Sequence, residues 1–297
     1  MRRYQAVFAL VLITAIWGST FIIVKQSLDL LGPFAFIAAR FWLAGLTLLL
    51  CLLPRRHKVS PRLVRDGVLA GLALTVGFVT QTLGLQTISA GKAAFITGMS
   101  VVLVPLLTAL LFRRWPRRAA VIGAALAFLG LGLMTLSGAT RQLARVTSGD
   151  GWALACAFGF AAHIMLTGRF SIRHDTLLFT LIQLLTVALL ATIAALLLER
   201  DALLPPPTLW LTLGYMGALA TGGVYFLQSW AQRYTSSTTT ALIFTLEPVF
   251  AALFAVAFAG EQLGLPQWVG GLLILGGMLA AELGHAPSPV AEVEGYA

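Results

Sequence analysis

The sequence predicts an all-α integral membrane protein with ten transmembrane helices in two inverted five-helix repeats. Ten predominantly apolar stretches of about twenty residues follow one another, and a helix needs about 20 residues to cross a hydrocarbon core of about 30 Å. Charged residues make up 10% of the chain, against about 25% in a soluble domain. A membrane β-barrel is excluded, because its strands would alternate polar and apolar residues over about 10 positions.

The ten expected spans are separated by short polar breaks. In order they are Gln5–Val24, Pro33–Leu53, Gly67–Gln86, Gly91–Phe112, Arg118–Ser137, Gly151–Phe170, Leu177–Leu198, Leu209–Ala231, Ser237–Ala259 and Gly264–Leu283. The first stretch is too long for a signal peptide, lacks a convincing cleavage site and is followed at once by a second span. No loop is long enough for a folded domain, so any function must lie within the helices or at their ends.

The net charge of +9 follows from topology and requires no nucleic-acid partner. With the N-terminus in the cytoplasm, the inner loops and span ends hold fourteen Lys and Arg residues and the outer ones hold five. This asymmetry fits the positive-inside rule and predicts that both termini are cytoplasmic, in an inner or plasma membrane. Cys51 and Cys156 fall inside spans, which makes a disulfide framework unexpected.

The chain also carries an internal duplication. Residues 67–137 overlay on 214–284 at a constant offset of 147, and the first two spans overlay on the sixth and seventh at an offset of 143. Five spans per repeat is an odd number, so the halves must be inverted in the membrane, as in many transporters. We expect one repeat over residues 1–140, a second over 141–285, and a disordered cytoplasmic tail over 286–297.

Several local patterns resemble the EamA-type family of the drug/metabolite transporter superfamily. They are Trp17-Gly18-Ser19-Thr20-Phe21, Gln81-Thr82-Leu83-Gly84-Leu85-Gln86, Ser89-Ala90-Gly91-Lys92, Leu246-Glu247-Pro248-Val249 and Gln267-Trp268-Val269-Gly270-Gly271. The resemblance implies ten helices in two inverted halves and the export of small metabolites, often amino acids. It implies no catalytic residues and no particular substrate.

Glu247 is the foremost candidate for a functional residue. It lies ten residues into the ninth span, near the membrane midplane, where a carboxylate costs roughly 2.5 kcal/mol or more unless it faces water or a partner. Pro248 removes a backbone donor and favours a kink beside it. Glu247 is therefore a candidate proton site or substrate-amine contact, or else a structural residue at a kink. Ser100 overlays on it in the other half and is a candidate ligand contact or packing hydroxyl.

Arg40 and His163 are the next candidates. Arg40 lies about 10 Å below the outer surface, where it could snorkel or pair structurally, or bind a substrate carboxylate through its bidentate fork. His163 lies near the midplane and is either a proton relay or a hydrogen-bonded packing residue. Trp17 lies away from the interfacial belt, which favours packing or cavity lining. Gln81 and Tyr225 are polar residues that could line the same cavity.

These observations favour a secondary active transporter that exports small metabolites or amino acids by alternating access. Its expected partners are a small-molecule substrate, the bilayer and protons or an exchanged metabolite, with no cofactor or metal, as a monomer or homodimer. One alternative is an intramembrane hydrolase using Ser100 and His163, although Val101 stands where rhomboid-type proteases have glycine. The other alternative is a channel or scaffold, which would not require an inverted repeat.

Overall fold

A computed structural model describes residues 1–53, 58–112, 117–136, 147–199, 204–259 and 262–283, and every regular element in these ranges is a helix. The expected tail at 286–297 lies outside the described residues. The helices are α1 (Arg2–Gly18), α2 (Thr20–Leu28), α3 (Pro33–Leu52), α4 (Pro61–Thr87), α5 (Ala90–Gly98), α6 (Ser100–Phe112), α7 (Arg118–Leu136), α9 (Ser148–Phe170), η1 (Ser171–Arg173), α10 (Thr176–Leu198), η2 (Pro207–Leu209), α11 (Trp210–Gly214), the π-helix η3 (Tyr215–Gly223), α12 (Val224–Ala231), α13 (Ser237–Phe244), α14 (Glu247–Ala259) and α15 (Leu265–Leu283).

Each of the ten apolar stretches coincides with one helix or with a run of consecutive helices. Seven described helical segments are long and apolar enough to cross a membrane. The first expected span is divided at Ser19, the eighth contains the π-helix, and the described apolar part of the last spans only Leu265–Ala281. The chain is thus an all-helical, multi-pass membrane protein, and the count of ten crossings stays a prediction.

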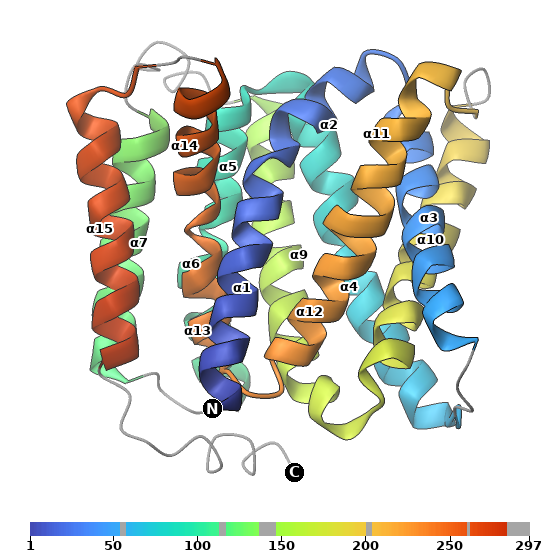
Figure 1. Cartoon of the computed structure of the whole chain (residues 1–297), viewed down its shortest axis with the longest axis horizontal. Coiled ribbons are helices and arrows are strands. Elements are labelled where there is room, and N and C mark those ends of the chain that lie inside the picture. The colour runs from blue at the N-terminus through green and yellow to red at the C-terminus, as the bar shows by residue number, and fades with distance from the viewer. Residues whose placement is uncertain (54–57, 113–116, 137–146, 200–203, 260–261, 284–297) are drawn as a thin grey trace.

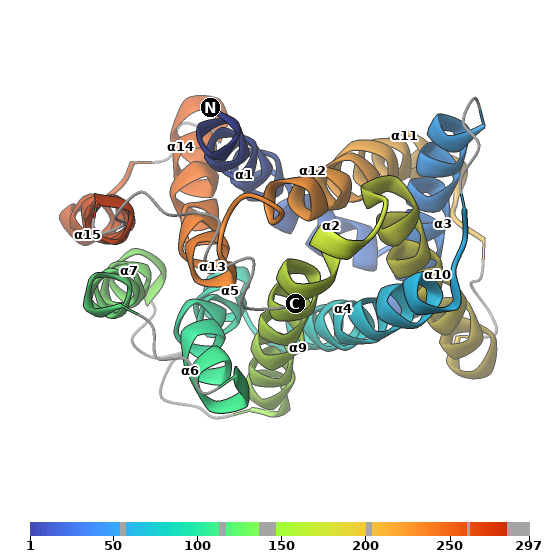
Figure 2. The same ribbon diagram turned by 90° about the horizontal axis from the view of Figure 1, so that it is seen from below.

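The helices stand in two rows with a pair at each end (Figures 1 and 2). Figure 2 shows α13–α14, α1 and α11–α12 in one row and α5–α6, α9 and α4 in the other. The helices α3 and α10 close one end, and α7 and α15 form a separate pair at the other. Figure 1 shows that α1 begins and α15 ends at the same lower end of the bundle.

Several helices begin at capping residues that are visible in the sequence. Ser60 accepts a hydrogen bond from the Leu63 amide before α4, and Asp175 accepts from two amides before α10. The helix α3 is capped from the other half of the chain: the Glu199 carboxylate accepts hydrogen bonds from the Phe34 and Ala35 amides at 2.9 and 2.8 Å. These bonds satisfy amides that a helix leaves unpaired at its start, and so they define the helix boundaries.

Glycines allow α7 and α15 to pack closely. A Cβ atom at Gly123 would lie 2.5 Å from the carbonyl oxygen of Gly277, and one at Gly130 would meet the carbonyl oxygen of Gly270. At the offset of 147, Gly123 corresponds to Gly270 and Gly130 to Gly277. Each glycine therefore packs against the counterpart of the other, which is the reciprocal contact pattern of a twofold interface.

Candidate functional site: a polar cavity between the helix rows

A cavity of about 100 Å³ lies inside the bundle. One water needs roughly 10–15 Å³ of such space, so the cavity has room for several waters or part of a small metabolite. Its walls combine aromatic rings with a few polar and charged side chains. All seven candidate residues from the sequence line it: Trp17, Arg40, Gln81, Ser100, His163, Tyr225 and Glu247.

Arg40 reaches the cavity from α3 and is held by the π-helix. Its Nε donates to Thr221 Oγ1 at 2.5 Å, and its Nη2 donates to the Ala220 carbonyl oxygen at 3.3 Å. The guanidinium also lies over the Phe78 ring, 5.0 Å from the centroid. Arg40 is only 4% exposed. It therefore does not snorkel to the membrane surface, and its guanidinium is instead paired with groups inside the protein. The two hydrogen bonds use two of the five N–H donors of a guanidinium, which leaves the end-on face of the fork for a carboxylate.

The π-helix also contacts both α1 and α3. Thr221 Oγ1 donates to the Met216 carbonyl oxygen five residues earlier, at 2.6 Å, and Trp17 Nε1 of α1 donates to Ala220 at 3.1 Å. A Cβ atom at Gly217 would lie 2.9 Å from the Arg40 carbonyl oxygen, so the glycine lets α3 approach. A π-helix is rare and frequently found at functional sites.

Glu247 begins α14, directly after a break in the ninth expected span. The helix α13 ends at Phe244, and Thr245 and Leu246 separate it from Glu247. The fourth expected span breaks at the corresponding place, between Gly98 and Ser100, so Ser100 and Glu247 each start the second part of a broken span. Pro248 accounts for the break in α13–α14. No proline accounts for the other break, since Pro105 lies further along α6.

Arg40 and Glu247 bring opposite charges to one cavity. Their charges interact electrostatically, and no direct ion pair joins these two described residues. The start of a helix and a nearby arginine both stabilise a carboxylate anion, and burial opposes it. The arrangement thus offers one position for an anionic group and one for a cationic group in the same cavity.

His163 lines the cavity and is also hydrogen-bonded to neighbouring side chains. Its Nε2 lies 2.8 Å from Gln183 Oε1 and 3.2 Å from Thr167 Oγ1, which matches the packing interpretation. Gln183 is the repeat counterpart of Arg40. The ring stands edge-on to Tyr225, with centroids 5.5 Å apart, and Tyr225 in turn contacts Trp17 at 5.6 Å. These rings give the cavity an apolar wall beside its charges.

The sequence interpretation missed several cavity residues. They are Phe78, Thr97, Phe160, Gln228, Phe244 and Thr245, among others. The aromatic residues gave no signal, because rings in apolar helices more often pack in the core. Gln228 was recognisable from the sequence. It corresponds to Gln81 at the repeat offset of 147, and a polar cavity residue in one repeat marks its counterpart in the other as a candidate.

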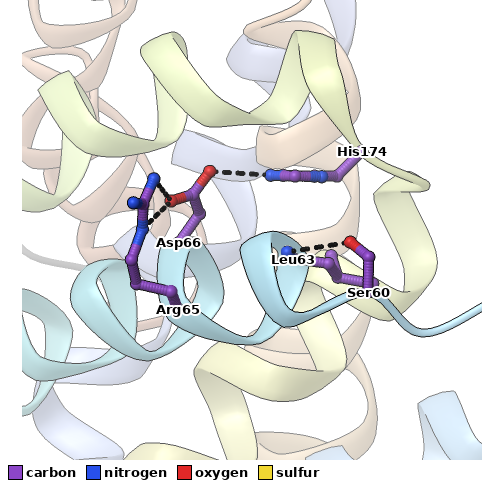
Figure 3. Close-up of polar contacts among 5 residues, drawn as sticks. All are labelled: Ser60, Leu63, Arg65, Asp66 and His174. Atoms are coloured by element: carbon purple, nitrogen blue, oxygen red, sulfur yellow. Dashed lines mark hydrogen bonds and ion pairs between the residues drawn. The ribbon is translucent and has the colours of Figure 1, made fainter.

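Where it borders α4, the cavity lies toward the end of that helix that leads to α5. Its α4 residues, Phe78, Gln81 and Leu85, fall in the last ten residues of that helix. At the opposite end of α4, Figure 3 shows Asp66 joined to Arg65 and to His174. Asp66 Oδ2 lies 2.8 Å from His174 Nε2, and Arg65 donates to Asp66 Oδ1 at 2.9 and 3.0 Å.

This second cluster ties the two halves of the chain together. Arg233 donates to the His174 carbonyl oxygen and to Thr176 Oγ1, at 3.2 and 2.9 Å. Apolar core side chains, including Leu74 and Leu177, lie in the cluster of buried residues that surrounds this end of α4. Hydrogen bonds and ion pairs therefore join α4, the segment after η1 and the segment after α12 at this end of the bundle. Among the described residues, no three His, Cys, Asp or Glu side chains are grouped to hold a metal ion.

A polar, charged cavity inside a bundle of apolar helices is the general layout of a membrane transport protein. The chain belongs to the EamA-like transporter family, whose model matches residues 5–136 and again residues 147–281. The family and the relatives below indicate a transporter and not an enzyme.

The relatives include an uncharacterized transporter of Archaeoglobus fulgidus, 34% identical over 93% of this chain and 85% of the relative. The uncharacterized inner membrane transporter YedA of Escherichia coli K12 is 26% identical over 98% of this chain and 94% of its own length. An S-adenosylmethionine/S-adenosylhomocysteine transporter of Chlamydia muridarum is 38% identical, but over only 32% of this chain and 31% of the relative. One crystal structure with 20% identity superposes with a TM-score of 0.80, covering 94% of this chain and 98% of that one, which shows the fold alone.

Proposed function

We propose that this transporter moves a small zwitterionic metabolite, of the amino-acid class, through the cavity between Arg40 and Glu247. The single observation that carries the proposal is the presence of these two opposite charges in one cavity without a direct ion pair between them. Arg40 would bind the carboxylate end-on, and Glu247 would bind the ammonium group. The aromatic wall around Tyr225 would cover the apolar part of the substrate.

The two matched stretches of the family model and the reciprocal glycine contacts of α7 and α15 support two inverted five-helix repeats. Inverted repeats around a midplane site suit alternating access. If both termini are cytoplasmic, the end of the bundle that holds the Asp66 cluster is the inner one. We infer that this cluster closes the inner end and that the cavity opens toward the outside. The structure then corresponds to an outward-facing state, from which an exporter returns to collect its substrate.

The partial match to the S-adenosylmethionine/S-adenosylhomocysteine transporter is compatible with this substrate class, because methionine-derived metabolites carry an amino-acid group. That match covers too little of the chain to select a substrate. Protons are the proposed coupling ion, with Glu247 and His163 as the proposed residues that bind and release them.

Counterflow in liposomes tests the proposal. Purified protein is reconstituted with an unlabelled zwitterion inside, and uptake of the labelled zwitterion is measured with and without a pH gradient. We expect counterflow for at least one zwitterion and little for analogues that lack either charge. Equal rates for the zwitterion and for its amide and deaminated analogues would remove the two-charge site from the mechanism.

A further inference from the structure

Gln228 of α12 lies at the end of a hydrogen-bond relay beside the cavity. Its Nε2 donates to Gln232 Oε1 at 3.1 Å, and Gln232 Nε2 donates to the Ile164 carbonyl oxygen of α9 at 2.8 Å. Gln228 and Gln232 are both buried, and Gln228 lines the cavity. The relay therefore leads from a backbone carbonyl in α9 to a side chain at the cavity wall.

The backbone carbonyl fixes the direction of the whole relay. An amide side chain can be flipped so that its oxygen and nitrogen exchange places, and the hydrogen-bond network decides between the two. A backbone carbonyl can only accept, so Gln232 must present its nitrogen to Ile164 and its oxygen to Gln228. Gln228 must then present its nitrogen to Gln232. Its own oxygen is left as the open end of the relay.

That oxygen has no hydrogen-bond partner among the described residues, and it is buried. Buried polar atoms almost always have a partner, and each exception calls for an explanation. The neighbouring cavity supplies one: Gln228 belongs to its wall, so a ligand there can bring the missing donor once the amide group, which is fully buried in this structure, turns toward it. The carboxylate of Glu247 cannot serve as that donor while it is ionised.

We propose that Gln228 is a specificity-determining residue that accepts a hydrogen bond from an N–H group of the substrate. This inference rests on the proposed transport of a zwitterion and adds a requirement to it: the cationic nitrogen must carry a hydrogen. A site built around a buried acceptor discriminates against analogues that lack the donor, because the acceptor is then left unpaired. Quaternary ammonium zwitterions would be rejected even though their charges are the same.

The test compares zwitterions that differ in the number of N–H groups. The probes are phenylalanine, methionine and leucine, each with its N,N-dimethyl and N,N,N-trimethyl derivatives. The dimethyl compounds keep one N–H and the trimethyl compounds have none, so a step between these two reports the donor apart from the gradual increase in bulk. Apparent affinity is measured for purified protein from ligand-induced thermal stabilisation, which does not require transport.

We expect the wild type to bind at least one dimethyl compound about tenfold or more tightly than its trimethyl derivative. Gln228→Met, which is similar in size, should reduce that ratio to about one. Gln228→Glu retains an acceptor oxygen and should keep most of the ratio if the Met variant does not fold. The control is Thr180→Val, which removes a buried hydroxyl that bonds within its own helix and is not part of the cavity wall; its ratio should equal that of the wild type.

The outcomes separate the two proposals. If the wild type binds these zwitterions but shows no step between dimethyl and trimethyl compounds, or if Gln228→Met keeps the step, the inference about Gln228 is wrong and the proposed function stands. If the wild type binds none of the compounds, the proposed substrate class fails, and the inference fails with it.

Discussion

At the scale of single residues, the cavity depends on a few polar side chains whose burial must be compensated. An arginine in the middle of a membrane helix costs roughly 2.5–3.5 kcal/mol. Arg40 recovers part of this cost through Thr221, Ala220 and the face of Phe78. Its position is thus determined by the π-helix, while part of its fork remains available. Such a residue can serve both structure and binding, so its two roles must be separated by experiment.

Arg40→Lys is expected to reduce transport at least tenfold at normal membrane abundance. Lysine keeps the charge but loses the planar fork, and it cannot bond Thr221 and Ala220 in the same geometry. Initial uptake rates at matched protein level measure the effect, with Arg62→Lys at an exposed helix start as the control. Wild-type rates in Arg40→Gln would leave Arg40 with a structural role only.

Glu247→Gln is expected to mimic the protonated carboxyl group. Substrate binding should weaken, because a neutral amide no longer pairs with the ammonium group of the substrate. Proton-driven flux should be lost, and exchange should become less sensitive to pH. A purely structural Glu247 would instead give lower abundance with an unchanged pH profile. Uptake against pH for the wild type and the variant, at equal protein level, distinguishes the two roles. Parallel curves would exclude Glu247 from coupling and make His163 the next residue to test.

Much of the cavity could be predicted from the sequence because polar side chains are expensive within apolar helices. Arg40, Gln81, His163 and Glu247 each stood out for that reason, and all of them line the cavity. The sequence could not reveal the partners. That Arg40 meets Thr221 depends on the contact between α3 and the π-helix, and the open acceptor of Gln228 depends on a carbonyl of α9.

At the scale of helices, close packing depends on small residues, since apolar burial contributes little to helix association in lipid. The pair of α7 and α15 illustrates this, because backbone approaches backbone at two glycine contacts. Two adjacent glycines of α15 differ in how closely α7 approaches them. Gly277 contacts Gly123, whereas a Cβ atom at Gly276 would meet nothing within 4 Å.

Gly277→Ala is expected to destabilise the protein, whereas Gly276→Ala is not. A Cβ atom at Gly277 would lie 2.5 Å from the Gly123 carbonyl oxygen and 3.0 Å from the Ala127 amide nitrogen. Backbone atoms cannot move aside cheaply, and overpacking costs typically about 1–3 kcal/mol. Thermal unfolding of both purified variants is the measurement. Equal midpoints for the two variants would contradict the packing of α7 against α15.

The Asp66 cluster is expected to keep its end of the bundle closed. Asp66→Asn removes the charge that joins α4 to His174, so that end should open more often. A cysteine at Ser171, which is fully buried in η1, reports this opening through its rate of modification by a thiol reagent in a background without Cys51 and Cys156. We expect a several-fold faster rate in Asp66→Asn.

Asp150→Asn is the matched control for this experiment. Asp150 pairs with Lys92 at 2.7 Å and also joins the two halves, but at the opposite end of the bundle. It should leave the rate at Ser171→Cys unchanged. An equal increase in both variants would mean that loss of an ion pair loosens the whole protein, and the closing role of Asp66 would be wrong.

Most helix limits were predicted within four residues, although α4 begins at Pro61, six residues before the expected Gly67. Of the interruptions, only the one beside Pro248 was expected. Runs of apolar residues fix a long helix through hydropathy, and caps such as Ser60 fix its ends. The division at Ser19 and the π-helix at Tyr215–Gly223 carry no comparable signal. They depend on which helix packs alongside, as Gly217 against Arg40 illustrates, and that is a property of the tertiary structure.

At the scale of the whole molecule, orientation determines what the cavity does. The same structure is outward-facing if its closed end is cytoplasmic and inward-facing if that end is external. The distribution of basic residues predicts the first, since fourteen of the twenty Lys and Arg residues are expected in the loops and span ends on the side of Arg62. Exposed positions at both ends of the bundle make this testable.

Arg62→Cys is expected to be protected from membrane-impermeant thiol reagents in intact cells, and Leu204→Cys is expected to be labelled. Arg62 is exposed at the start of α4, near the closed end, and Leu204 is 85% exposed in the connection between α10 and α11. The background lacks Cys51 and Cys156, and permeabilised cells, in which both positions should react, verify that each cysteine is accessible. The reverse pattern would invert the orientation and turn the outward-facing state into an inward-facing one. Labelling of both positions from outside would be incompatible with the odd number of spans between them and would exclude the inverted repeat.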